Sequence, residues 1–135
     1  MPLLFTKGNK IMEQKDTRII TNEKTGETRV LTVWNGGVSE EQIKVWKNEY
    51  RKIYAIEVED EEDLYIGYFR RPNLETMSAV NKIAKTDEIK STTIMFDNCW
   101  LGGEPVMKTD TLVRIAAIKQ LGEMFNRVMG TLKNL

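Results

Sequence analysis

The only cysteine of the chain, Cys99, stands where a nucleophile could be framed by glycines. It lies in the stretch "IMFDNCWLGGEP", residues 94–105, beside Trp100 and before the pair Gly102 and Gly103. A reactive thiolate needs a pKa lowered by a helix N-terminus or by a nearby cation. We expect Cys99 near the C-terminal end of a helix, where the helix dipole opposes a negative charge. The pattern therefore favours a small buried side chain next to an aromatic anchor.

Charged side chains form two further candidate sites. The run "EVEDEED", residues 57–63, carries six carboxylates in seven positions and could hold Ca²⁺. A calcium loop needs alternating ligands and a central glycine, and this run has no glycine. Arg70 and Arg71, in "FRRP" at residues 69–72, could bind a carboxylate or a phosphate. We expect a solvated hairpin tip at 57–63, and arginines that pair with the acidic strand beside them.

The sequence has no histidine, and this limits the chemistry most. Without histidine there is no Ser-His-Asp or Cys-His catalysis, no usual general base near neutral pH, and few ways to build a zinc or iron site. An enzyme would depend on carboxylates, lysine or tyrosine. We therefore expect a protein that is not an enzyme, with no catalytic residue, no cofactor and no metal.

Length and charge place the chain among ordinary soluble domains. It has 135 residues, enough for one hydrophobic core, and 20 basic against 20 acidic side chains. Phosphate binding needs a basic excess, so nucleic acid is not an expected partner. A single cysteine makes no internal disulfide, which indicates a reducing compartment, and we expect the cytoplasm. We see no signal peptide and no apolar run of roughly 18 residues, so no membrane contact is expected.

Two hairpins are predicted from alternating apolar residues. In the first, residues 17–34, two strands rich in Ile, Val and Thr flank a turn at Gly26, which supplies a positive φ. The second covers residues 53–69 around the acidic run. Gly36 and Gly37 follow the first hairpin as a possible hinge, which favours docking of this hairpin at some distance from the domain. We therefore divide the chain into an N-terminal arm, residues 1–38, and an α+β domain, residues 39–135.

Four helices are predicted from apolar residues at helical spacing. Each begins at a residue that can cap it, and the third ends at the Gly102–Gly103 pair, which favours a left-handed cap. Their ranges are 39–52, 73–85, 87–100 and 111–132. The last has the broadest apolar stripe, which we expect to be buried: Leu112, Ile115, Ala116, Ile118, Leu121, Phe125, Val128 and Leu132. The fold class is thus α+β, with antiparallel hairpins packed on a bundle of about four helices.

Methionine and aromatic side chains are frequent in the last helices. The residues are Met95, Met107, Met124, Phe125 and Met129. They could fill the core, or they could form an adaptable surface for a partner helix. We take Met124, Phe125 and Met129, together with Trp34, Arg70 and Arg71, as candidate partner-binding residues.

The order of these elements resembles that of a known group. An amphipathic helix, a hairpin ending in an aromatic residue and Arg-Pro, a helix, a second helix ending near "NCWLGG" and a final helix closing with "LKNL" follow one another over residues 40–135. This pattern resembles small proteins of tailed bacteriophages and Bacteroidetes prophages, which are similar to tail assembly chaperones.

The resemblance implies a non-enzymatic adaptor. Such chaperones bind the long tape measure protein, keep it soluble and help to recruit tail tube subunits. The expected partner is thus a tape measure or tail tube protein, in the host cytoplasm if a phage encodes the chain. We also expect a homo-oligomer.

Two other classes of function stay open. The chain could be a virion structural component that self-assembles when the 1–39 arm adds a strand to a neighbouring subunit. It could also be a carboxylate- or metal-dependent enzyme at the acidic hairpin.

Overall fold

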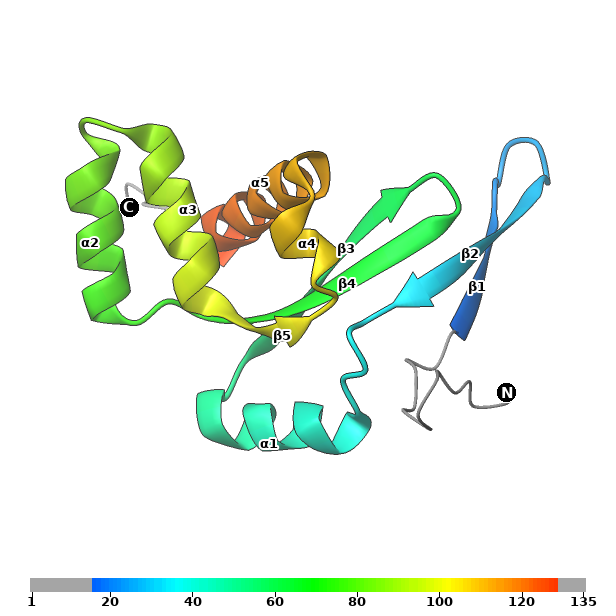
Figure 1. The fold of residues 1–135 in the computed structure, drawn as a ribbon, viewed down its shortest axis with the longest axis horizontal. Helices are drawn as coiled ribbons and strands as arrows, with labels where there is room; N and C mark the ends of the chain where they lie inside the picture. The colour runs from blue at the N-terminus through cyan, green and yellow to red at the C-terminus, as the bar shows by residue number, and fades with distance from the viewer. Residues whose placement is uncertain (1–15, 129–135) are drawn as a thin grey trace, which may run out of the picture.

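The computed structural model describes residues 16–128 and shows an α+β protein (Figure 1). The strands are β1 (Asp16–Thr21), β2 (Thr28–Trp34), β3 (Ile53–Asp60), β4 (Asp63–Arg70) and β5 (Trp100–Gly103). The helices are α1 (Glu40–Tyr50), α2 (Leu74–Ala84), α3 (Glu88–Cys99), α4 (Val106–Thr109) and α5 (Thr111–Val128). The predicted fold class is confirmed. No helix within the described residues is long and apolar enough to cross a membrane.

The four predicted helix starts are confirmed by side-chain caps. The side chains of Ser39, Asn73, Asp87 and Asp110 each accept a hydrogen bond from the backbone N–H three residues later. Each bond satisfies one of the N–H groups that a first helical turn leaves without a partner. These caps depend on local sequence alone, which is why they could be predicted.

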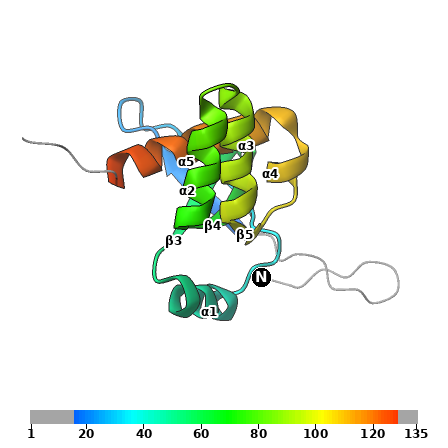
Figure 2. The same cartoon turned by 90° about the vertical axis from the view of Figure 1, so that its left-hand side faces the viewer.

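The sheet is mixed and is built around β4. The long hairpin β3–β4 is antiparallel, with Asp60 paired to Asp63 at its tip and Ile53 to Arg70 at its base. Along its other edge, β4 pairs first with β2 in parallel and then with β5 antiparallel. Figures 1 and 2 show α1 on one side of the β3–β4 ribbon and the other helices on the opposite side.

Each face of β4 contributes to a separate apolar cluster because side chains alternate along a strand. Phe69 and Tyr65 point to the helix-covered face, where the core contains Ile56, Val58, Phe96, Cys99, Met107, Val113, Ala117 and Leu121. Leu64, Ile66 and Tyr68 point the other way and are also buried. On that face the ring of Trp46 in α1 lies 5.8 Å from the ring of Tyr68.

The third predicted helix ends earlier than expected. We predicted that it would include Trp100 and end at a left-handed cap formed by Gly102 and Gly103. The helix α3 instead ends at Cys99, and Trp100–Gly103 form β5. Gly103 lies opposite Gly67 of β4, where a Cβ on Gly103 would lie 2.6 Å from the Cα of Gly67. These glycines therefore allow two backbones to approach, and the short helix α4 that follows was not predicted.

The N-terminal hairpin belongs to the sheet. Thr32, Val33 and Trp34 of β2 pair with Asp63, Leu64 and Tyr65 of β4, and the Trp34 indole N–H donates to Asp63 at 2.9 Å. Two ion pairs add to this contact, Arg18–Glu57 and Arg29–Glu59, both at 2.7 Å. The expectation that this hairpin docks at a distance from the domain is wrong. The division into an arm and a domain at residues 38 and 39 stays a prediction. The structure does not describe residues 1–15 and 129–135, so the predicted end of the last helix and Met129 lie outside the described residues.

Gly36 and Gly37 have different environments, although both have positive φ, 70° and 74°. A Cβ on Gly36 would collide with the carbonyl of Gly103 and lie 3.0 Å from the Glu104 nitrogen. A Cβ on Gly37 would meet no atom within 4 Å. Gly36 is therefore a packed contact between the hairpin and β5, which contradicts its prediction as a free hinge.

Alanine at these two glycines should separate backbone strain from steric clash. We expect Gly37→Ala to destabilise the protein by about 1–2 kcal/mol, from the positive φ alone. Gly36→Ala should cost a further ~1–3 kcal/mol because the backbone of Gly103 must move. Urea unfolding of both variants measures the difference. Equal losses would show that Gly36 does not pack against β5 in solution.

Candidate functional site

Cys99 is a core residue without the properties of a nucleophile. It is fully buried and belongs to the cluster beneath the helices. Burial raises the pKa of the Cys99 thiol to about 11, and the positive charge of Arg70 offsets only part of this effect. Because thiolate is the reactive form, Cys99 is protonated near neutral pH. The buried apolar role predicted from the sequence is confirmed.

We expect Cys99 to resist thiol reagents in the folded protein. At about pH 8 a disulfide reagent such as Ellman's should react only after unfolding, because neither access nor thiolate is available before it. Cys99→Ser should cost about 1–3 kcal/mol of stability by placing a hydroxyl in an apolar site. Absorbance after mixing, with and without urea, measures the reactivity. Rapid reaction of the native protein would contradict the burial of this thiol.

The thiol should also make stability depend on alkaline pH. The pKa of Cys99 is higher in the folded protein than in the unfolded chain. The buried thiol therefore makes its full contribution to the free energy of unfolding below the unfolded-state pKa of about 8.5. This contribution is lost as the pH rises toward 11.

The acidic run forms the tip and one face of the β3–β4 hairpin. Glu57 and Glu59 pair with Arg18 and Arg29 of the N-terminal hairpin, and the hydrogen bond from Arg18 to Glu57 raises the pKa of Arg18. Among residues 16–128, no group of three or more histidine, cysteine, aspartate or glutamate side chains could hold a metal ion. Glu57 and Glu59 therefore connect the β3–β4 hairpin to the N-terminal hairpin.

Arg70 and Arg71 contact tyrosines, not the acidic run. The guanidinium of Arg70 lies 5.6 Å from the centre of the Tyr50 ring, and Arg71 donates to the Tyr54 hydroxyl at 2.7 Å. The register explains this, since Arg70 stands opposite Ile53 at the base of the hairpin, far from the acidic tip. The predicted pairing with the acidic strand is therefore wrong.

The candidate partner-binding residues do not form one surface. Trp34 lies beside the start of β4, and Arg70 and Arg71 lie at or beyond its end. Met124 and Phe125 are half-buried and pack against the core. Among the other methionines, Met107 is fully buried and Met95 packs on the same cluster. Met95, Met107 and Met124 thus contribute to the core, and the role of the methionines in binding stays a prediction.

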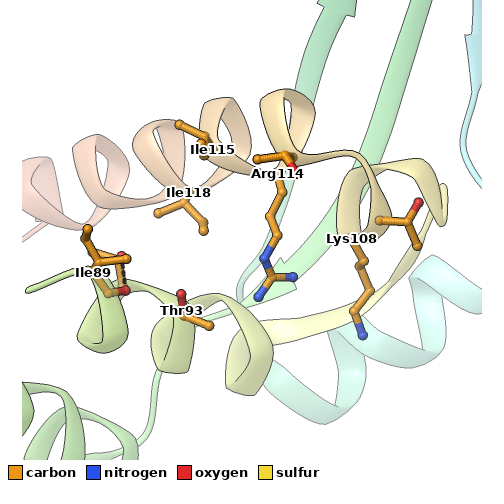
Figure 3. Close-up of a pocket in the computed structure, with 9 residues that line it drawn as sticks. Ile89, Thr93, Lys108, Arg114, Ile115 and Ile118 are labelled. Carbon is orange, nitrogen blue, oxygen red and sulfur yellow. Dashed lines mark hydrogen bonds between the residues drawn. The ribbon is translucent and has the colours of Figure 1, made fainter.

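A groove between α3 and α5 is lined mainly by apolar surface (Figure 3). It has a volume of about 450 Å³, about three times that of a cavity that holds benzene. Ile89, Thr92 and Thr93 of α3 form one wall, and Thr111, Arg114, Ile115 and Ile118 of α5 form the other. Lys108 and Thr109 of α4 close one end.

Large apolar side chains at this groove are open to solvent. Ile89 is 80% exposed and Ile115 is 57% exposed. Leu112, one turn before Ile115 on α5, is 79% exposed. Isolated exposed apolar residues are common, but two that line one hollow with a third on the adjoining helix surface are typical of an interaction site.

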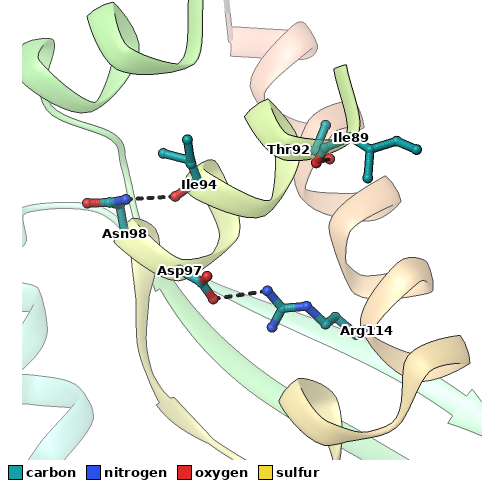
Figure 4. A network of polar contacts seen from close by, with 6 residues as sticks. All are labelled: Ile89, Thr92, Ile94, Asp97, Asn98 and Arg114. Carbon is teal, nitrogen blue, oxygen red and sulfur yellow. Dashed lines mark hydrogen bonds and ion pairs between the residues drawn. The ribbon is translucent and has the colours of Figure 1, made fainter. Parts of the chain in front are cut away.

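The other end of the groove is cationic. Arg114 spans the gap between the helices, where it pairs with Asp97 of α3 at 3.1 Å and covers the Phe96 ring at 4.6 Å (Figure 4). The Lys108 ammonium lies 5.4 Å from the centre of the Trp100 ring. Within the described residues, no carboxylate forms an ion pair with Lys108. The groove therefore has an apolar end and a positively charged end.

The sequence did not reveal this groove. We assigned Leu112 and Ile115 to the buried stripe of the last helix. The helix α5 instead buries Val113, Ala117 and Leu121, which recur every four residues. It leaves Leu112 and Ile115 exposed. One feature of the sequence could have indicated this exposure. The apolar stripe of the last helix is wider than the single face that packs against a core.

No family model, curated protein or solved structure matches this chain.

Proposed function

We propose that this protein is a non-enzymatic adaptor that binds another protein in the α3–α5 groove. Its partner, on this proposal, is the tape measure or tail tube protein of a phage tail, and its place of action is the host cytoplasm. The pattern that resembles tail assembly chaperones spans residues 40–135 and so includes both helices of the groove. The methionines that first suggested a binding surface do not carry the proposal.

One observation carries it: Ile89 and Ile115 face the same hollow from two helices while exposed to water (Figure 3). Covering a fully exposed isoleucine contributes about 1.5–3 kcal/mol. Ile89 and Ile115 are 80% and 57% exposed, so each can supply a part of this amount to a complex, and Leu112 beside them can add to it. An adaptor that must later release its partner needs a surface of moderate affinity such as this one.

We expect a charge in this groove to abolish partner binding. The protein would be co-expressed with a tagged tape measure or tail tube protein encoded beside it, and its recovery measured after affinity purification. Ile115→Asp should reduce recovery at least about tenfold, because a carboxylate would be buried against apolar atoms. Its matched control is Val45→Asp on α1, since Val45 is 55% exposed and lies outside the groove.

Folding must be checked in the same experiment. Both variants should unfold within about 1 kcal/mol of the parent protein, as exposed positions usually do. Equal recovery of the two variants would contradict the groove as the binding site. Failure of the parent protein to recover either tail protein would contradict the proposed partners.

Self-assembly through β1 is a second candidate function, that of a virion structural protein. Among the described residues, β1 lies at one edge of the sheet, and Ile19 within it is exposed. An open edge strand is a template for pairing with another chain. Light scattering would test this, since Ile19→Lys should reduce the mass of any oligomer that forms through this edge.

A further inference from the structure

We infer that the α3–α5 groove binds an amphipathic helix whose apolar face ends in an acidic side chain, with that carboxylate against Lys108. This inference rests on the proposed adaptor function and specifies the chemistry of the partner segment.

The walls of the groove favour a helix over an extended peptide. Both walls are helices, whose backbone N–H and C=O groups bond within their own turns. The hydroxyls of Thr92 and Thr109 also donate to their own helices, at the carbonyls of Ile89 and Pro105. The groove thus offers few backbone partners to an added strand, whereas a helix satisfies its own backbone and needs only apolar contact.

The isoleucines determine the apolar part of the partner. Ile89 from α3 and Ile115 and Ile118 from α5 surround one end of the hollow (Figure 3). A helix presents side chains at intervals of three and four residues along one face. Two or three leucine-sized side chains with this spacing fit the apolar end of the groove.

The charges determine the polar part of the partner. Two of the groove's lining residues are cations, Lys108 and Arg114, and none is acidic. The carboxylates nearby are already engaged: Asp97 pairs with Arg114, and Asp110 accepts from the backbone N–H of Val113. Lys108 contacts the Trp100 ring but pairs with no carboxylate of residues 16–128, so its charge can pair with an acidic side chain of the partner about one turn beyond the leucines.

The test uses two synthetic helical peptides of about 20 residues, long enough to form a helix. Each has leucines at positions i, i+4 and i+7 in an alanine and glutamine background. One carries Glu about one turn beyond the last leucine, and the other carries Lys there. Fluorescence anisotropy of labelled peptides measures affinity for the full chain.

The parent protein should bind the Glu peptide about fivefold more tightly than the Lys peptide, the effect of one surface ion pair. Lys108→Glu should reverse this preference. The matched control Lys82→Glu, at an exposed position of α2 outside the groove, should leave the preference unchanged. Ile115→Asp should weaken both peptides about tenfold. The preference should fall at high salt.

The outcomes separate the two proposals. If both peptides bind equally and both require Ile115, the groove binds helices but the inferred acidic side chain is wrong. If neither peptide binds while recovery of the tail protein still requires Ile115, the inferred helical occupant is wrong and the adaptor function stands. If Ile115→Asp affects neither peptide binding nor recovery, both proposals fail.

Discussion

Replacing Phe69 with alanine is expected to lower the free energy of unfolding by about 3–5 kcal/mol. The Phe69 side chain is fully buried where β4, α3 and β5 meet. Its ring lies edge-on to Phe96 at 5.2 Å and to Trp100 at 5.4 Å, and these two rings stack on each other. Truncation would remove the central member of this cluster, so both the transferred surface and the aromatic contacts would be lost.

Equilibrium unfolding in urea measures this loss, with Val45→Ala as the control. Val45 is 55% exposed on α1, so its truncation should change stability by at most about 0.5 kcal/mol. A loss for Phe69→Ala no larger than that of the control would show that this aromatic cluster is not the core of the protein.

Leu31→Ala is expected to cost about 2–5 kcal/mol, nearly as much as a central core residue. Leu31 is 1% exposed although it belongs to the N-terminal hairpin. Like Leu64, Ile66 and Tyr68, it is buried but lies outside the cluster beneath the helices. The parallel pairing of β2 with β4 places Leu31 where the hairpin meets the sheet.

The neighbouring residue Val30 provides the control for this prediction. Val30 and Leu31 are consecutive in β2 and therefore point to opposite faces, and Val30 is exposed. Val30→Ala should cost less than about 1 kcal/mol. Equal, small losses for the two variants would mean that the hairpin does not dock on the sheet in solution.

The features that were predicted from sequence are those with local causes. Ser39, Asn73, Asp87 and Asp110 bond within three residues of themselves, and the strands of both hairpins follow from alternation. These signals gave the α+β class and most element boundaries. The burial of Cys99 was predicted because a position near a helix end and the lack of histidine both argue against a thiolate.

The features that were missed depend on contacts between distant segments. The strand β5 forms because Gly103 allows its backbone to lie against Gly67, 36 positions earlier in the chain. The parallel pairing of Trp34 with Tyr65 likewise has no local signal. Periodicity identified the apolar residues of α5, but it does not say which of two adjacent rows another element covers. The exposure of Ile115, and with it the groove, therefore required the structure.

Site-specific photo-crosslinking tests the central claim, that the α3–α5 groove holds a partner protein. A photoreactive phenylalanine analogue at position 115, and separately at position 45, would be introduced into the protein during co-expression with the tail proteins. We predict that irradiation links position 115 to one helical segment of the tape measure or tail tube protein, identified by mass spectrometry, and that position 45 gives no such product. Crosslinks from position 45 alone, with a partner that still co-purifies, would contradict the account.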